Sequence, residues 1–253
     1  MAEESGDVTE AAGVNGAAGP DRGEPDTGYA EEDGRLTLRE RKKLRTRQRI
    51  SGEAALLFVE RGFDNVTVAE VARAAEVSTM TVFNYFPRKE DLFLDRIPEG
   101  QELVTRAVRE RAAGETPLDA LRRLAFGLLE QRHPLGGVGE GFPYFWRTVL
   151  DSPALRARAR EAVEELEDTL AGLLAEAAEA GRKAGPGDGP VAGGRRQDVR
   201  LAAALIVAAY RAAYAGAAAR QLEGDPAEGV AVEQESVLHR TFDALARALP
   251  DGG

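Results

Sequence analysis

The chain has 253 residues, a length that fits one or two domains, and its 43% hydrophobic and 30% charged residues are ordinary for a soluble protein. It contains no cysteine and only two histidines, which excludes disulfides, thiolate metal sites and cysteine nucleophiles and argues against a histidine-rich metal site. We therefore expect no metal and no cofactor. The acidic opening MAEESGDVTE has no apolar core, so no secretory signal is expected, and the lack of cysteine fits a cytoplasmic protein.

The net charge of −10 is unevenly distributed. Residues 1–34 hold ten acidic residues and one arginine and show no hydrophobic period, which predicts a disordered acidic tail. Residues 35–95 carry a net charge of +3, and residues 96–253 a net charge of −4. Within residues 35–49, eight basic residues accompany one acid, Glu40. Such a run is usually a solvated helix face; the alternative is an arm that contacts DNA.

Strand-like alternation is nearly absent, whereas apolar residues recur at helical spacing. The first predicted helix ends at Gly62, and its inward positions are Ile50, Ala54, Leu57 and Phe58. Thr67 and Glu70 form a capping box, and Ser78 is a second helix cap. The predicted helices of this part cover residues 38–61, 67–75, 78–85 and 88–113.

Further helices are predicted over residues 117–131, 142–150, 153–180, 197–222 and 232–249. A Gly/Pro-rich loop is predicted at 181–196. Residues 201–219 contain one charge, Arg211, near the middle and are mostly alanine, whereas a membrane span needs about 20 strongly apolar residues. We therefore expect a buried helix in a soluble protein, and the fold class is expected to be all-α.

Residues 67–86, TVAEVARAAEVSTMTVFNYF, have the pattern of a helix-turn-helix motif: a short helix, a four-residue turn and a second short helix. Val71 and Ala72 face inward on the first helix, and Val82 and Phe86 anchor the second. A helical hairpin in an ordinary bundle is the alternative. The residues around the motif favour DNA binding.

Residues 45–97 resemble the TetR/AcrR family of helix-turn-helix transcriptional regulators. The resemblance rests on Ile50, Ala54, Phe58, Arg61, Gly62, Phe63, Thr67, Val68, Val71, Ala72, Val77, Ser78, Thr81, Phe83, Tyr85, Phe86, Pro87, Lys89, Glu90 and Leu92. It implies an N-terminal three-helix DNA-binding domain, here residues 35–95, and a C-terminal helical domain for effector binding and dimerisation, here residues 96–253. The implied function is a sequence-specific regulator, a repressor that a small molecule releases from a palindromic operator.

The second helix of the motif supplies the candidate contacts to base edges, because small polar side chains let a helix enter the major groove. These residues are Thr79, Met80, Thr81 and Asn84, and Ser78 is a further DNA-binding candidate that is expected to face outward. The candidate phosphate contacts are Thr67, Tyr85, Lys89 and the basic arm at 39–49, including Arg45 and Arg47. Phe83 stands where the family has a phosphate-touching tyrosine and, without a hydroxyl, can only pack. The arm is expected to clamp the DNA backbone; insertion into the minor groove is the alternative.

Three departures from the family pattern leave the sequence preference open. Glu76 replaces the usual turn glycine, and because a left-handed backbone strains glutamate, a slightly different turn is expected. Thr79 and Met80 replace a frequent Lys-Gly pair, and Met80 offers an apolar contact to a thymine methyl. Asn84 replaces the usual histidine, and an asparagine can pair bidentately with adenine.

The last two predicted helices resemble the family's dimer interface, a four-helix bundle shared by two chains. The small face of the first is Leu201, Leu205, Ala208, Ala212, Ala215, Gly216 and Ala219, and its bulky face is Ile206, Val207, Tyr210 and Tyr214. The final helix repeats Leu238, Phe242, Leu245 and Leu249. Packing within one chain is the alternative, but the resemblance favours a homodimer.

In the family, the middle helices enclose a pocket for a small effector. The candidate lining is Phe126, Phe142, Phe145, Trp146, Arg147, Tyr210 and Tyr214. For each of these residues, ordinary core packing is the alternative. His133 is expected in a loop, and His239 is expected to face solvent.

Two other classes of function compete with a regulator. The chain has no nucleophile elbow, metal motif or phosphate loop, so an enzyme would have to rely on carboxylates alone. A non-specific nucleic-acid binder would be basic overall, whereas residues 96–253 are acidic. We therefore expect no enzymatic activity, and we expect double-stranded DNA and a small-molecule effector as partners.

Overall fold

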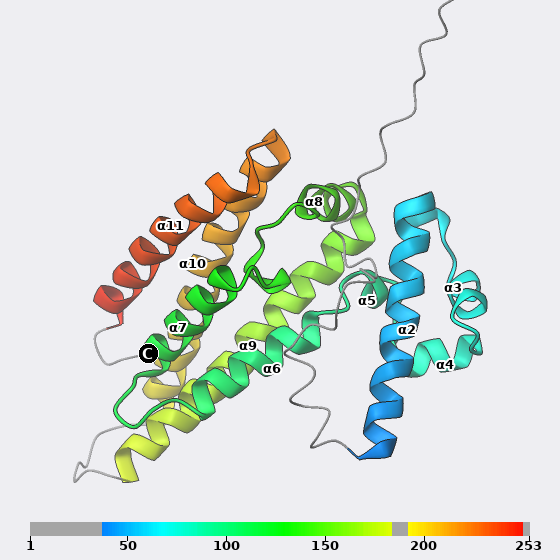
Figure 1. Cartoon of the computed structure of the whole chain (residues 1–253). Coiled ribbons are helices and arrows are strands. Elements are labelled where there is room, and N and C mark those ends of the chain that lie inside the picture. Colours follow the sequence, from blue (N-terminus) through cyan, green and yellow to red (C-terminus); the bar gives the residue numbers. More distant parts are fainter. Residues whose placement is uncertain (1–36, 184–191, 250–253) are drawn as a thin grey trace, which may run out of the picture.

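The computed structural model describes residues 37–183 and 192–249, so the expected acidic tail lies outside the described residues. Throughout these two ranges the regular elements are helices, as the all-α prediction requires (Figure 1). The chain forms an N-terminal group, in which short helices lie against the 24-residue helix Leu38–Arg61, beside a larger C-terminal helical bundle.

The helix-turn-helix consists of α3 (Val68–Ala74) and α4 (Thr79–Tyr85), held by α2 (Leu38–Arg61). Capping explains these boundaries. Thr37 and Thr67 each form a capping box with the glutamate three residues later, and Ser78 caps α4. Gly62 ends α2 with φ of 80°, a conformation that favours glycine, before the short 3₁₀ helix η1 (Phe63–Asn65).

The predicted continuous helix over residues 88–113 is wrong. The structure has two helices there, α5 (Glu90–Phe93) and α6 (Ile97–Arg109). Pro98 lies in the first turn of α6. In a continuous helix, Pro98 would lack a hydrogen-bond donor and its ring would clash with the carbonyl of Leu94. The chain therefore leaves the helix at Leu94 and starts again at Ile97.

The C-terminal bundle follows the predicted order with two corrections at its ends. Its elements are α7 (Pro117–Glu130), η2 (Pro134–Gly136), α8 (Phe142–Asp151), α9 (Pro153–Lys183), α10 (Ala192–Glu223) and α11 (Ala227–Ala248). Because α9 continues to Lys183 and α10 begins at Ala192, the predicted loop at 181–196 is too long; residues 184–191 lie outside the described residues. The last helix starts five residues before the predicted position 232.

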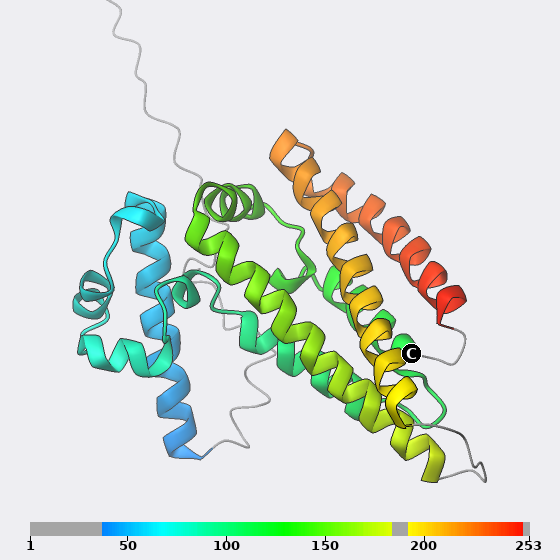
Figure 2. The same ribbon diagram turned by 180° about the vertical axis from the view of Figure 1, so that it is seen from behind.

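Buried side chains form two cores. In the C-terminal core, α10 packs between α9 and α11, and α6 and α7 pack against α9 and α11 respectively (Figure 2). Its members include Val108, Leu121, Leu170, Ile206 and Leu238. The N-terminal core surrounds α2 to α5 but also contains Val149 of α8 and Leu155 of α9. Residues beyond the expected boundary at 95 therefore help to close the core of the DNA-binding part.

One described helix, Gln197–Glu223 within α10, is long and apolar enough to cross a membrane by length and composition. Its core-facing residues, among them Ala203, Ile206, Val207 and Ala217, are buried against neighbouring helices. The prediction of a buried helix therefore holds for one face only, because 39% of this apolar stretch is buried in the described chain and the opposite face is exposed.

Candidate functional site

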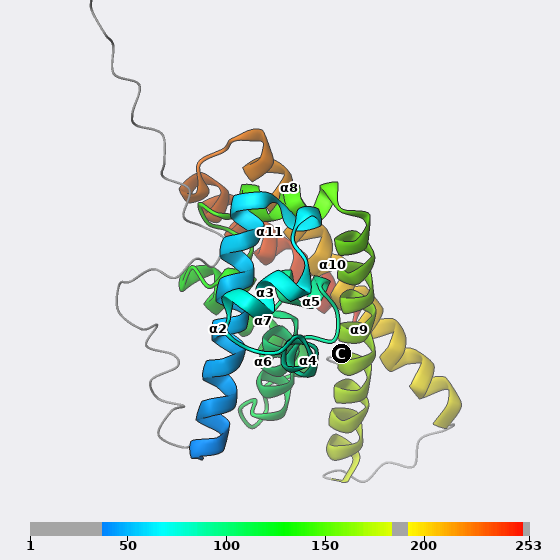
Figure 3. The ribbon, with the colours of Figure 1, turned by 90° about the vertical axis from the view of Figure 1, so that its right-hand side faces the viewer.

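The exposed face of α4 carries the residues predicted to meet DNA. Val82 is buried in α4 and Phe86 just after it, whereas Thr79 and Asn84 are exposed. The side chains of Met80 and Phe83 are 69% and 43% exposed, which is high for large apolar residues. Figure 3 looks onto this side of the molecule, with α3 and α4 in front of the C-terminal helices. One short helix thus offers a mixed polar and apolar surface of the size that a major groove admits.

The turn before α4 has the left-handed conformation in spite of its glutamate. Glu76 has φ of 51°, and the amide of Val77 donates to the carbonyl of Ala72 at 2.9 Å. The expectation of a different turn is therefore wrong. Neighbouring hydrogen bonds hold Glu76 in a backbone region that L residues with a side chain seldom adopt.

Two predicted hydroxyl contacts are already engaged within the chain. The Thr67 hydroxyl donates to Glu70 Oε2 at 2.7 Å, and its oxygen accepts from the Glu70 amide. The Ser78 oxygen accepts from the Thr81 amide at 3.0 Å, and the two hydroxyls lie 2.8 Å apart. Both residues stay exposed at helix starts, where amide groups also point outward.

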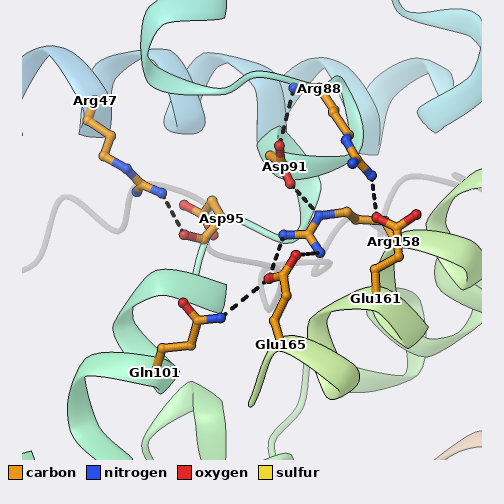
Figure 4. Close-up of polar contacts among 8 residues, drawn as sticks. All are labelled: Arg47, Arg88, Asp91, Asp95, Gln101, Arg158, Glu161 and Glu165. Carbon is orange, nitrogen blue, oxygen red and sulfur yellow. Dashed lines mark hydrogen bonds and ion pairs between the residues drawn. The ribbon is translucent and has the colours of Figure 1, made fainter. Parts of the chain in front are cut away.

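Lys89 and Arg47, two of the predicted phosphate contacts, each pack over an aromatic ring, but only Arg47 also donates a hydrogen bond to the backbone. Lys89 Nζ stands 4.3 Å from the centre of the Phe63 ring, and burial lowers the pKa of Lys89. The Arg47 guanidinium lies over Phe86 at 4.6 Å and donates to the carbonyl oxygen of Asp95 at 2.7 Å. Arg47 is therefore tied to the segment between α5 and α6 (Figure 4). Arg45 is exposed on α2, and Tyr85 is half-buried on α4.

Charged side chains join α5 to α9, a link that the sequence reasoning missed. Arg158 Nε donates to Asp91 Oδ1 at 2.7 Å, and its terminal nitrogens reach Glu165 (Figure 4). Arg88 pairs with Glu161 alongside. Since Arg158 is only 12% exposed, this pair is screened less than a surface pair. The partners in the Arg158–Asp91 and Arg88–Glu161 pairs lie 67 and 73 residues apart, so no local pattern indicated these two pairs.

Helix α8 packs directly against the DNA-binding part. The Tyr144 hydroxyl donates to the carbonyl oxygen of Phe58 at 2.7 Å, near the end of α2. Val149 is buried in the N-terminal core, and Phe145 packs against that core. The predicted aromatic helix is thus also a connecting element between the two parts.

Aromatic rings form a continuous row through this contact. Phe93 of α5 lies 5.9 Å from Phe63 and stacks on Phe145 of α8 at 5.4 Å with an angle of 8°. Phe145 meets Trp146 edge-on at 5.1 Å, and Trp146 meets Tyr214 of α10 edge-on at 5.2 Å. The row leads from the N-terminal core to the middle of the C-terminal bundle.

The structure brings together most of the predicted effector lining. Tyr210 stacks on Tyr214 at 6.1 Å, and Phe142 lies 6.0 Å from Phe145. Two residues of the prediction lie elsewhere. Phe126 packs against His239 and Phe242 on the side of α11, and Arg147 is exposed. Phe126 lies on the face of α7 that packs against α11, and Arg147 lies on the outer face of α8, so neither side chain joins the other predicted lining residues.

Both histidines are accounted for. His133 caps η2 and lies 3.1 Å from a carboxylate oxygen of Glu99, and exposed His239 lies beside Arg122. Within the part of the chain that the structure describes, no three metal-binding side chains gather in one place.

The small face of α10 has no partner in the described chain. Leu201, Leu205, Ala208, Ala212, Ala215, Gly216 and Ala219 are all exposed. The bulky face points inward: Ile206 and Val207 are buried, and Tyr210 and Tyr214 are half-buried. Leu238, Phe242 and Leu245 of α11 are buried in the C-terminal core and Leu249 packs on it, so these four residues pack within one chain, which was the alternative to a role in a dimer interface.

Comparison with known proteins gives a match to the family model "Bacterial regulatory proteins, tetR family" over residues 51–95. The chain is 35% identical over 141 residues, 54% of its length, to the HTH-type transcriptional regulator TcmR of Streptomyces glaucescens. It is 27% identical over 94 residues, 36% of its length, to the probable HTH-type transcriptional regulator YttP of Bacillus subtilis. These matches span 62% and 45% of the two relatives, less than two thirds of either.

Two solved structures are similar across much of the chain. One is Thermus thermophilus FadR, a TetR-family transcriptional repressor in complex with lauroyl-CoA: 28% identity, TM-score 0.42, covering 76% of this chain and 92% of that one. The other is Salmonella enterica GusR, with 20% identity, a TM-score of 0.43, and coverage of 79% and 96%.

Proposed function

Because this chain belongs to the TetR family of bacterial DNA-binding transcriptional regulators, we propose that it is a sequence-specific repressor that a small-molecule effector releases from its operator. The observation that carries the proposal is the exposed face of α4. Its side chains Thr79, Met80 and Asn84 are exposed and can contact base edges in a major groove. Thr81 and Ser78 complete the base-facing set, and Lys89, Tyr85, Thr67 and Arg45 supply phosphate contacts. In this proposal Arg47 positions α2 instead of binding phosphate, because its guanidinium is engaged at Phe86 and Asp95.

Two copies bind one operator in this proposal. The small exposed face of α10 supports a homodimer, because alanine and glycine side chains let a second helix approach closely. Leu201 is 58% exposed and Leu205 is 39% exposed in the single chain. Exposed leucine side chains are unfavourable in water, and a dimer through this face would bury both of them. A two-fold dimer matches a palindromic operator with half-sites about 34–36 Å apart or a multiple of that.

Release follows from the position of α8. This helix carries Trp146 beside Tyr214 on one side and Tyr144 and Phe145 against the DNA-binding part on the other. A ligand that displaces Trp146 shifts α8 and with it the orientation of α4. It can do so only to the extent that it binds the released state more tightly. The proposal includes no enzymatic activity and places the protein in the cytoplasm.

The test is a selection of DNA sequences from a random library with the full-length protein, followed by shift assays on the enriched sequence and on the DNA upstream of its own gene. The proposal predicts a two-fold symmetric enriched sequence and a small molecule that weakens binding to it. Equal binding to all sequences would favour the non-specific binder instead.

A further inference from the structure

The first half of α2 carries exposed cations that have no acidic partner among the residues that the structure describes. This end of the helix, blue in Figure 1, projects past α4. The cations follow one another at spacings of three and four residues, so they are neighbours on the helix surface and repel one another. They are Arg39, Lys42, Lys43, Arg45 and Arg49, here called the basic stripe. An anion laid along the basic stripe would relieve this repulsion.

The one acid of this part of α2 is held at the start of the helix. The Glu40 carboxylate accepts from the amide of Thr37 at 2.8 Å and from its hydroxyl at 2.7 Å, within the capping box that opens α2. Arg47 is also set apart, because its guanidinium lies over Phe86 and donates to the backbone of Asp95. Residues 35–49 still carry a net charge of +7.

The chain itself supplies an anion of matching charge. Residues 1–34 hold ten acidic residues and one arginine, a net charge of −9. Six of the acids lie between Asp21 and Asp33, and Asp33 precedes Thr37, the N-cap of α2, by four residues. An extended chain from Thr37 to Asp21 can span about 55 Å, whereas the helix from Arg39 to Arg49 is ~15 Å long. The connection is therefore long enough for these acids to lie along the whole basic stripe.

We propose that residues 1–34 bind the basic stripe of their own chain and compete there with DNA. The covalent connection gives the acidic segment an effective concentration on the order of mM at the stripe, whereas DNA arrives from solution. DNA has to displace the carboxylates, which then take up salt cations, so the salt dependence of DNA binding becomes shallower than that of an uncovered stripe. The inference rests on the proposed function only in naming DNA as the competitor.

Contact between the two segments is tested on the full-length protein by zero-length carbodiimide cross-linking, which joins a carboxylate to a lysine that touches it, followed by peptide mass spectrometry. We expect links from carboxylates of residues 1–34 to Lys42 or Lys43. They should disappear when duplex DNA is added, and also at about 1 M salt, where the Debye length is about 3 Å. A mixture of isotopically labelled and unlabelled protein separates links within one chain from links between copies. Absence of these links, or links between copies alone, would overturn the inference.

Competition is tested with a full-length variant that changes all ten Asp and Glu of residues 1–34 to Asn and Gln. At about 50 mM salt it should bind a non-specific duplex ~10-fold more tightly than the native protein, and this ratio should shrink toward about 200 mM. The matched control has residues 2–34 in shuffled order, keeps every acid, and should bind DNA as the native protein does.

The two experiments together separate docking from repulsion at a distance. Tighter DNA binding by the amide variant without cross-links in the native protein would mean that the acids act through net charge alone, which contradicts docking. Equal DNA affinity of the two proteins would remove the inference and leave the proposed function intact. If neither protein selects a DNA sequence, the proposed function fails, while the cross-links still report the docking.

Discussion

At the scale of single residues, Asn84 is the clearest candidate for reading a base. It is exposed on α4, and its amide can both donate and accept toward one adenine. Asn84→Ala should relax the preference at one base pair per half-site and cost ~1–3 kcal/mol there. Competition assays with operators changed at single positions measure this. Loss of affinity that is equal for every sequence would mean that Asn84 does not read a base.

Lys89 is expected to act on every DNA sequence alike. Its ammonium lies over the Phe63 ring at the end of the motif and in this account neutralises one phosphate. Lys89→Ala should weaken specific and non-specific binding by the same factor and lower the slope of log affinity against log salt by ~0.9 per contact. Titrations at several salt concentrations, with Asn84→Ala as the matched control of unchanged slope, check this. An unchanged slope for Lys89→Ala would remove Lys89 from the phosphate contacts.

Glu76 provides a test of backbone strain. Its φ of 51° is a backbone conformation that glycine adopts without strain and that is unfavourable for glutamate. Glu76→Gly should therefore raise the free energy of unfolding by about 1 kcal/mol, while Glu76→Ala, which keeps the Cβ, should not. Chemical denaturation of the two variants measures the difference. If alanine stabilises as much as glycine, the turn is not strained at this position.

At the scale of helices, α9 is expected to stabilise the DNA-binding part. Leu155 is fully buried, and its neighbours in the core include residues of α2 to α5. Leu155→Ala should cost ~2–5 kcal/mol and should reduce hydrogen-exchange protection in α2 as well as in α9. The exposed change Ala178→Glu on the same helix is the control. Unchanged protection in α2 would mean that residues 35–95 fold independently of α9.

The same scale shows what could be predicted from the sequence. The bounds of α2, α3, α4 and α7 followed from caps and periodicity, because these signals lie within a few residues of the helix ends. The break before α6 also had a local signal, Pro98, which was overlooked. The pairing of Arg158 with Asp91 and the stacking of Phe93 on Phe145 could not be predicted, because tertiary packing alone decides which distant side chains meet.

Of the two candidate sites, the DNA-binding face could be predicted from local sequence signals, whereas the effector lining depends on tertiary packing. The outward face of α4 was predictable because a short amphipathic helix leaves little choice of inward residues. The effector lining was only partly predictable: Tyr210 and Tyr214 meet Trp146, but Phe126 faces α11. Composition located the aromatic residues, whereas the rotation of each helix decided which of them came together.

At the scale of the whole molecule, dimerisation through α10 should control operator binding. Ala212 lies on the exposed small face, so Ala212→Glu would place two carboxylates in the expected interface. We expect a monomer by analytical ultracentrifugation and a loss of operator affinity of at least about 100-fold, because two linked half-sites gain that much over one. Ala178→Glu adds the same charge on α9 and should remain dimeric. A dimer with full affinity in Ala212→Glu would place the interface elsewhere.

The measurement that tests the account most directly is a hydroxyl-radical footprint of the protein on its selected operator, combined with the stoichiometry of the complex. The account predicts two protein chains per operator and two protected half-sites related by two-fold symmetry, separated by one helical turn or a multiple of it. It also predicts that both protections disappear together when the effector is added. Protection without symmetry, or one chain per site, would contradict a two-fold repressor that reads DNA through α4.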